Sequence, residues 1–165
     1  MNNNSVPIQP KITQLTAKLL IGISCNMSVS NNKTAELWGN FGPRIKEIAN
    51  RVTTDKISLQ IYDANYHRGF NPSTIFKKWA AVEVHKGTKT PEGMKTLELE
   101  KGLYAVFHYK GSSADTGIFQ YIFGVWLPQS EYQIDNRPHF EVLGSKYRNN
   151  DSNSEEEIWI PVVKK

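Results

Sequence analysis

Apolar residues alternate with polar ones along several stretches of the chain, a period of two that is typical of β-strands. The stretches that this alternation predicts to be strands are 11–27, 56–63, 79–85, 96–110, 137–146 and 155–163. Within the long stretch 96–110, Gly102 predicts a bulge or bend, because a glycine weakens a strand interior. The polar segment 148–154 predicts a hairpin connection between the last two strands.

Two other stretches repeat their apolar residues at helical spacing. The first predicted helix covers 34–52 and carries Leu37, Phe41 and Ile45 on one face, with a break expected near Phe41 because Gly42-Pro43 follows. The second begins after Asp115, which can cap it, and presents Ile118 and Ile122. It is expected to end at Trp126-Leu127-Pro128, since the residue before a proline disfavours helix.

The order of these elements divides the chain into two similar halves, each reading strand–helix–strand–strand. Such a pattern predicts an α+β fold made of duplicated units that form a largely antiparallel sheet with two helices. Residues 1–10 are polar and contain two prolines, so we expect a disordered polar arm there. Residues 11–165 are expected to form a single domain.

Composition excludes several classes of function. The net charge of +4 comes from Lys and Arg that are scattered along the chain, whereas a direct nucleic-acid interface requires them to be clustered. There is no stretch long enough to span a membrane and no signal peptide, and Cys25 has no partner for a disulfide. The sequence therefore predicts a cytoplasmic protein that binds neither membrane nor nucleic acid directly.

The chain shows no pattern that requires a metal or cofactor. Its histidines, at positions 67, 85, 108 and 139, lack metal-ligand spacing. No glycine-rich phosphate loop or nucleophile elbow occurs. We expect neither a metal nor a cofactor.

The last predicted strand carries a candidate binding site. Ile158 and its alternate neighbours form an apolar face, and Glu157 and Trp159 share the other face. A carboxylate beside a large aromatic ring suits a flat or cationic organic molecule. On the preceding strand Glu141 repeats the pattern, so the two carboxylates can meet across one cavity if these strands are neighbours. The alternatives are a solvated strand end for Glu157 and edge-strand cover for Trp159.

Three aromatic residues are further candidates. Trp38 lies beside the apolar stripe of the first helix and is expected to face sideways, toward the cavity or the other half. Phe41 belongs either to the core or, at the kink, to the cavity wall. Tyr62 points opposite Ile61, as a ligand contact or as an exposed strand tyrosine. A break after Phe41 would let this turn move and admit ligands of different size.

Several short motifs, in this order, also resemble one known family. They are Leu37-Trp38-Gly39-Asn40-Phe41, Gln60-Ile61-Tyr62, Gly102-Leu103-Tyr104-Ala105-Val106-Phe107, Trp126-Leu127-Pro128-Gln129-Ser130-Glu131-Tyr132, Pro138-His139-Phe140-Glu141 and Glu157-Ile158-Trp159-Ile160-Pro161. Across residues 11–163 the chain resembles the gyrase-inhibitor-like superfamily, the effector-binding domain of AraC-type regulators. This resemblance implies two strand–helix–strand–strand units with a central small-molecule groove at their junction.

The resemblance also implies a function and its residues. It places the binding carboxylate at Glu157 and aligns Glu141 with a second one. From the pairing of carboxylate and aromatic faces on the last two strands, we expect an amphipathic, aromatic and cationic ligand, with Trp159, Trp38, Phe41 and Tyr62 as walls. Because few residues precede the first strand, we expect a stand-alone ligand sensor or sequestering protein without a DNA-binding domain. The family also contains hydrolases of electrophilic cyclopropane-bearing compounds, for which Glu157 or Glu141 with Tyr62 would be the general-base candidates, and inhibitors of DNA gyrase. A protein partner would then be a separate regulator or a topoisomerase.

Overall fold

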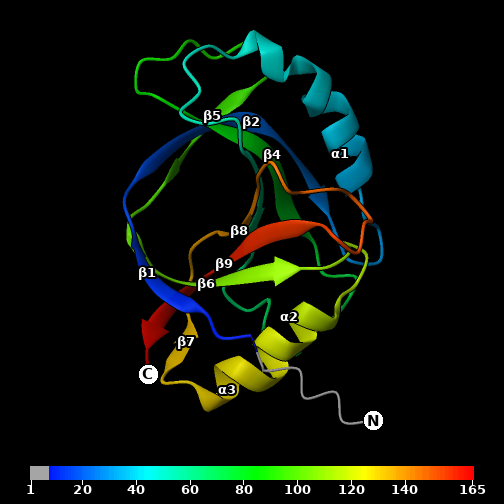
Figure 1. The fold of residues 1–165 in the computed structure, drawn as a ribbon, viewed down its shortest axis with the longest axis vertical. Coiled ribbons are helices and arrows are strands. Elements are labelled where there is room, and N and C mark those ends of the chain that lie inside the picture. The colour runs from blue at the N-terminus through cyan, green and yellow to red at the C-terminus, as the bar shows by residue number, and fades with distance from the viewer. Residues whose placement is uncertain (1–7) are drawn as a thin grey trace.

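A computed structural model describes residues 8–165, so most of the expected polar arm lies outside the described residues. One largely antiparallel sheet of nine strands forms the body of the molecule. Its order is β1-β6-β9-β8-β3-β4-β2-β5, and β7 pairs with β9. Figure 1 shows this sheet curling around a central axis, with the helices on its outside. The chain therefore has the α+β fold that the sequence predicts.

The sheet is built from two units with the same order of elements. The first consists of β2 (Lys18–Met27), α1 (Thr34–Phe41), β3 (Lys56–Ile61) and β4 (Phe76–Val84), and the second of β6 (Gly102–Lys110), α2 (Gly117–Tyr121), β8 (His139–Leu143) and β9 (Glu155–Lys164). In each unit the last strand lies in the middle, and the units meet where β3 pairs with β8. The predicted strand–helix–strand–strand duplication is confirmed.

Each unit is extended by a strand that comes from the other half of the chain. The predicted single strands 11–27 and 96–110 are each divided, into β1 (Lys11–Leu15) and β2, and into β5 (Lys95–Leu99) and β6. β1 pairs with β6, whereas β5 pairs with β2. Alternation alone did not show where each stretch divides into two strands. Both strands of a stretch have the same alternation, and they differ only in the strands with which they pair. Because β1 and β5 each pair with the unit of the other half, they connect the two units.

The first helix is interrupted where the sequence predicts. α1 ends at Phe41, and a 3-10 helix, η1 (Gly42–Glu47), continues the chain with Pro43 in its first turn. The expected helix 34–52 is thus shorter and broken, because proline cannot donate the helical hydrogen bond. Phe41 and Ile45 are both buried on either side of the break.

The second helical segment continues beyond its predicted end. α2 is followed by a π-helical turn, η2 (Ile122–Trp126), and by α3 (Leu127–Gln129), which contains Pro128. The π turn shifts the hydrogen-bond pattern just before Pro128, so the helical segment continues past this proline. The three-residue strand β7 (Tyr132–Ile134), which the pattern did not predict, follows. No helix among residues 8–165 is long and apolar enough to cross a membrane.

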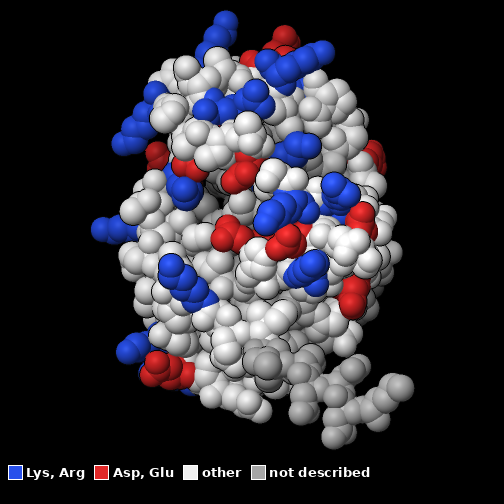
Figure 2. Space-filling view, viewed as in Figure 1, with Lys and Arg blue, Asp and Glu red and all other residues white. Residues whose placement is uncertain are grey.

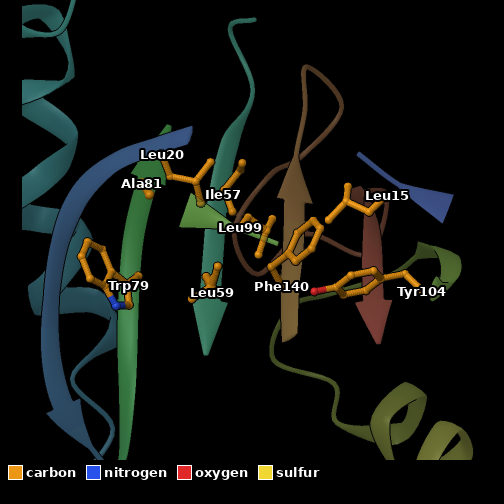
Figure 3. Close-up of a cluster of buried hydrophobic side chains, with 9 residues drawn as sticks. All are labelled: Leu15, Leu20, Ile57, Leu59, Trp79, Ala81, Leu99, Tyr104 and Phe140. Carbon is orange, nitrogen blue, oxygen red and sulfur yellow. The ribbon is translucent and has the colours of Figure 1, made fainter. Parts of the chain in front are cut away.

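The two faces of the sheet have separate cores. On the inner face one cluster gathers side chains from strands of both units, as Figure 3 shows: Leu15, Leu20, Ile57, Leu59, Trp79, Ala81, Leu99, Tyr104 and Phe140. On the outer face, one cluster lies beneath α1 and another beneath α2. The helices therefore cover the outer face over β2/β4 and β6/β9, while the inner face is lined by strands alone.

Candidate ligand-binding site

Glu141 and Glu157 lie on paired strands but point to opposite faces of the sheet. The register pairs Glu141 with Ile158, and Val142 with Glu157. Residues that face each other across a strand pair share a face. Ile158 packs beneath α2, whereas Val142 packs against the inner cluster. The expectation that the two carboxylates meet across one cavity is therefore wrong, because it requires a register shifted by one residue.

A row of large side chains crosses the inner face, and we call it the aromatic row: Trp79, Leu59, Phe140 and Trp159. Each member stands opposite the next in the registers of β4, β3, β8 and β9. Figure 3 shows the first three in succession. Trp159 stacks on Phe140 with ring centroids 5.1 Å apart and 17° between planes. Phe140 is buried in the core, so the open face of the pair is that of the half-buried Trp159.

Glu157 lies beside the aromatic row. It precedes Trp159 by two residues on the same face, and Trp159 Nε1 donates a hydrogen bond to Glu157 Oε1 at 3.4 Å. The residues in register with Glu157 have smaller side chains than the aromatic row: they are Val142, Ile57 and Ala81. The change from large to small side chains leaves room next to the carboxylate.

A cavity of about 230 Å³ opens at this position, lined by Asp55, His108, Val142, Gly144, Ser145, Lys146, Glu155, Glu156 and Glu157. We call it the acidic cavity, since Asp55, Glu155 and Glu157 outnumber Lys146 in its lining even without Glu156, whose raised pKa keeps it protonated at neutral pH. Glu155 is held by His108 at 2.9 Å and by Lys146 at 3.8 Å. In Figure 2 a hollow is visible inside the ring of strands, with acidic side chains at its rim. Such a site attracts cations.

Tyr104 is fully buried and supports the two stacked rings. Its ring lies edge-on to Trp159 at 5.7 Å and to Phe140 at 5.3 Å. The hydroxyl donates to the Pro138 carbonyl oxygen at 2.8 Å, and the Arg137 guanidinium lies 4.8 Å from the ring centroid. Burial raises the pKa of Tyr104 to about 12, so the phenol stays neutral and fixed.

Glu141 belongs to a different, buried polar cluster on the outer face. Lys78 and Glu156 are only 5% and 8% exposed there. The Gln60 amide, oriented to satisfy its neighbours, accepts from Lys78 Nζ and donates to the His139 carbonyl oxygen at 3.2 Å. Glu156, rather than Glu157, is thus the acidic residue of β9 that shares a face with Glu141.

Burial governs the protonation of this outer cluster. It raises the pKa of Glu141 and lowers that of Lys78, whose charge is in turn favoured by Glu141 and Glu156. The pKa of Glu156 rises to about 8, first through burial and then through the nearby Glu141. Glu156 therefore keeps its proton at neutral pH.

The remaining predicted residues also lie away from the inner face. Phe41, the last residue of α1, is fully buried, and Trp38 packs edge-on against the Phe41 ring at 5.8 Å. Tyr62 stacks on Tyr66 at 4.3 Å. The structure therefore brings together Glu157 and Trp159, and it separates them from Glu141, Tyr62, Trp38 and Phe41. Of the two expected general-base pairs, only Glu141 with Tyr62 shares a face.

Sequence reasoning missed Trp79, Phe140 and Tyr104. Alternation with Ala81 and Val142 could have placed Trp79 and Phe140 on a buried face, but it gives no information on which strands are neighbours. The indole Nε1 of Trp79 is buried and has no hydrogen-bond partner among residues 8–165. Within the same residues, no group of three or more His, Cys, Asp or Glu is placed to hold a metal ion.

The fold and the chain as a whole match one family. The family model of the GyrI-like small-molecule-binding domain covers residues 8–163. Because this match includes nearly all of the chain, the protein belongs to that family. The sequence resemblance to gyrase-inhibitor-like proteins is confirmed, and the chain is a small-molecule-binding domain.

Individual relatives agree with this membership. The transcriptional regulator BrlR of Pseudomonas aeruginosa is 27% identical over 157 residues, which cover 92% of this chain and 54% of BrlR. The chain thus spans about half the length of that curated relative. EcmrR in its DNA complex has a TM-score of 0.74 at 12% identity, covering 99% of this chain and 60% of EcmrR. SAV2435 bound to tetraphenylphosphonium has a TM-score of 0.60 at 18% identity, covering 94% of each chain. These two structures share the fold.

Proposed function

We propose that this domain binds aromatic or lipophilic cations on the inner face of the sheet. Glu157 supplies the negative charge, and the half-buried indole of Trp159, backed by Phe140, supplies the ring surface. The observation that carries the proposal is the partly buried carboxylate of Glu157 within 3.4 Å of the indole nitrogen of Trp159. An aromatic face contributes about 0.5–2 kcal/mol to the binding of a cation, depending on desolvation.

Two further observations support a cationic ligand. The acidic cavity beside the aromatic row contains more carboxyl groups than basic groups. In addition, the structural relative SAV2435 was solved with tetraphenylphosphonium, a lipophilic cation with four aromatic rings. A partly buried carboxylate is costly unless it is paired, and a bound cation lowers that cost.

We also infer a role as a ligand sensor or sequestering protein. BrlR is a transcriptional regulator, and EcmrR was solved in complex with DNA. A domain with the same fold can report a bound compound to a DNA-binding partner or simply retain it. The unpaired Cys25 is consistent with a reducing, cytoplasmic setting.

Titration of the protein with tetraphenylphosphonium and with neutral triphenylphosphine oxide, followed by tryptophan fluorescence, tests the proposal. The cation should bind more tightly than the neutral compound. Glu157→Gln should weaken the cation by about 1.5–3 kcal/mol, the usual strength of a charge-assisted contact, and leave the neutral compound nearly unchanged. Glu98→Gln is the matched control. Glu98 is exposed on β5, so its replacement removes the same charge outside the proposed site. Equal affinity of both compounds for the native protein would contradict a cationic ligand.

A further inference from the structure

A second cavity, of about 350 Å³, lies away from the inner face. Its walls come from the start of the β3–β4 loop, from α3, from β7 with the turn after it, and from His139 and Lys165. It shares no lining residue with the acidic cavity. Its volume is within the range of small-molecule pockets, which is roughly 300–1,000 Å³. We call it the imidazole cavity.

Two histidines form part of an aromatic wall in this cavity. The His67 ring stacks against Phe123, at 5.4 Å, and against His139, at 5.2 Å, with planes within 25° of parallel, and these two rings lie 6.2 Å from each other. The Tyr62 ring stands edge-on to His139 at 4.9 Å. Tyr62 and His67 come from the loop after β3, Phe123 from the π turn and His139 from β8, so the fold brings together residues that are distant in sequence. A flat ring has an aromatic surface to contact here.

His139 provides a polar group at this wall. The residue is 4% exposed, but its ring nitrogens are not among the fully enclosed side-chain atoms of residues 8–165 that lack a hydrogen-bond partner. Burial, with smaller contributions from His67 and Arg137, lowers the pKa of His139 to about 3. The neutral imidazole therefore offers one donor and one acceptor. A ligand in the cavity can hydrogen-bond to either nitrogen.

The charge of the imidazole cavity differs from that of the acidic cavity. Its lining contains three basic residues, Arg68, Arg137 and Lys165, and two acidic ones, Asp63 and Asp135. Arg137 Nε donates to Asp135 Oδ2 at 2.6 Å, so these two charges are paired. Arg68 is exposed at the rim and forms no ion pair within the described residues. A free guanidinium at the edge of an aromatic pocket fits a carboxylate.

We propose that the imidazole cavity is a second ligand site, which takes a planar aromatic acid. The ring lies against the His67, His139 and Tyr62 wall, a ligand atom hydrogen-bonds to the His139 imidazole, and the carboxylate meets Arg68. The site is independent of the cation site at Glu157, and the domain would hold two ligands of opposite charge at once.

Titration with 2-naphthoate and with its neutral isostere 2-naphthamide tests this site, with the imidazole C–H signals of the four histidines as reporters in NMR. The acid should shift the His67 and His139 signals saturably and leave His85 unchanged. Arg68→Gln should weaken 2-naphthoate about ten- to a hundredfold, as expected for loss of a contact to a charged group, and leave 2-naphthamide unchanged. Arg51→Gln is the matched control, because Arg51 is an exposed arginine outside the cavity.

Three results would overturn the second site. One is the absence of a saturable shift at His67 and His139. Another is equal weakening of the acid and the amide by Arg68→Gln, or no weakening of either. The third is displacement of 2-naphthoate by tetraphenylphosphonium, since the two sites share no residue. The first two readouts do not involve the cation, so they remain valid if the cation fails to bind at Glu157, and the two proposals fail separately.

Discussion

Glu156 and Glu157 are consecutive residues of β9 whose side chains enter different environments on opposite faces of the sheet. Glu157 points to the inner face, where it meets the indole of Trp159. Glu156 points to the outer face, where it is 8% exposed near Lys78 and Glu141. One strand therefore supplies a carboxylate to a ligand-accessible surface and a protonated carboxyl group to a buried cluster.

Removal of the Trp159 ring should weaken cation binding. Trp159→Leu keeps an apolar side chain on the inner face but removes the stack on Phe140 and the hydrogen bond to Glu157. We expect the affinity for tetraphenylphosphonium to fall about tenfold, the value of a cation–aromatic contact of about 1–2 kcal/mol. Isothermal titration calorimetry measures this affinity without relying on tryptophan emission. Trp126→Phe, on the outer face, should leave the affinity unchanged, and equal losses in both variants would contradict the assignment.

The raised pKa of Glu156 makes stability depend on pH. Its folded pKa is about 8 and its ordinary value is 4.5, so between these values the folded protein holds a proton that the unfolded chain releases. The contribution of this group to stability therefore decreases as the pH rises through that interval. Glu156→Gln imitates the protonated form. Relative to the native protein, this variant should gain on the order of 2 kcal/mol in the free energy of unfolding between pH 5 and pH 8.

Urea unfolding at the two pH values measures this difference. Glu141 and Lys78 remain in both proteins, so the comparison isolates Glu156. Glu155→Gln serves as the control, because its pKa is lowered, chiefly by the hydrogen bond from His108. Relative to the native protein, Glu155→Gln should show no gain in the free energy of unfolding between pH 5 and pH 8. A stability difference between the native protein and Glu156→Gln that is constant from pH 5 to pH 8 would contradict the buried, protonated carboxyl group.

Gly22 should be essential for the close approach of β2 and β4. A Cβ on Gly22 would overlap the Ala80 carbonyl oxygen and approach Ala81 Cα to 2.8 Å, so β2 and β4 would have to separate. We expect Gly22→Ala to reduce the free energy of unfolding by about 3 kcal/mol. In Gly39→Ala, where nothing lies within 4 Å, alanine should stabilise α1 by about 0.5–1 kcal/mol. Thermal unfolding of both variants compares them, and a harmless Gly22→Ala would refute the close approach.

The sequence was sufficient to predict the fold class and the duplication of units. Alternation identified β3, β4 and β9, and the Gly42-Pro43 pair located the end of α1 near Phe41. The division of the stretches 11–27 and 96–110 was not predictable in the same way. Each contains two strands with similar alternation, and only their pairing with the opposite unit distinguishes them.

The candidate site was predictable only in part, because it depends on register. Alternation correctly placed Glu157 and Trp159 on one face of their strand. It could not decide whether Glu141 joins them, since a shift of one residue between β8 and β9 exchanges the faces. For the same reason Trp79 and Phe140 were not recognised as neighbours of Trp159, although they come from strands that the pattern identified.

The most direct test of the central claim compares Glu157→Gln with Glu141→Gln in calorimetric titrations with tetraphenylphosphonium. The two glutamates lie on paired strands, but only Glu157 faces the aromatic row. We predict that Glu157→Gln weakens binding by about 1.5–3 kcal/mol, whereas Glu141→Gln changes it by less than about 0.5 kcal/mol. Loss of affinity in Glu141→Gln with native affinity in Glu157→Gln would contradict the inner-face site and place the ligand on the outer face.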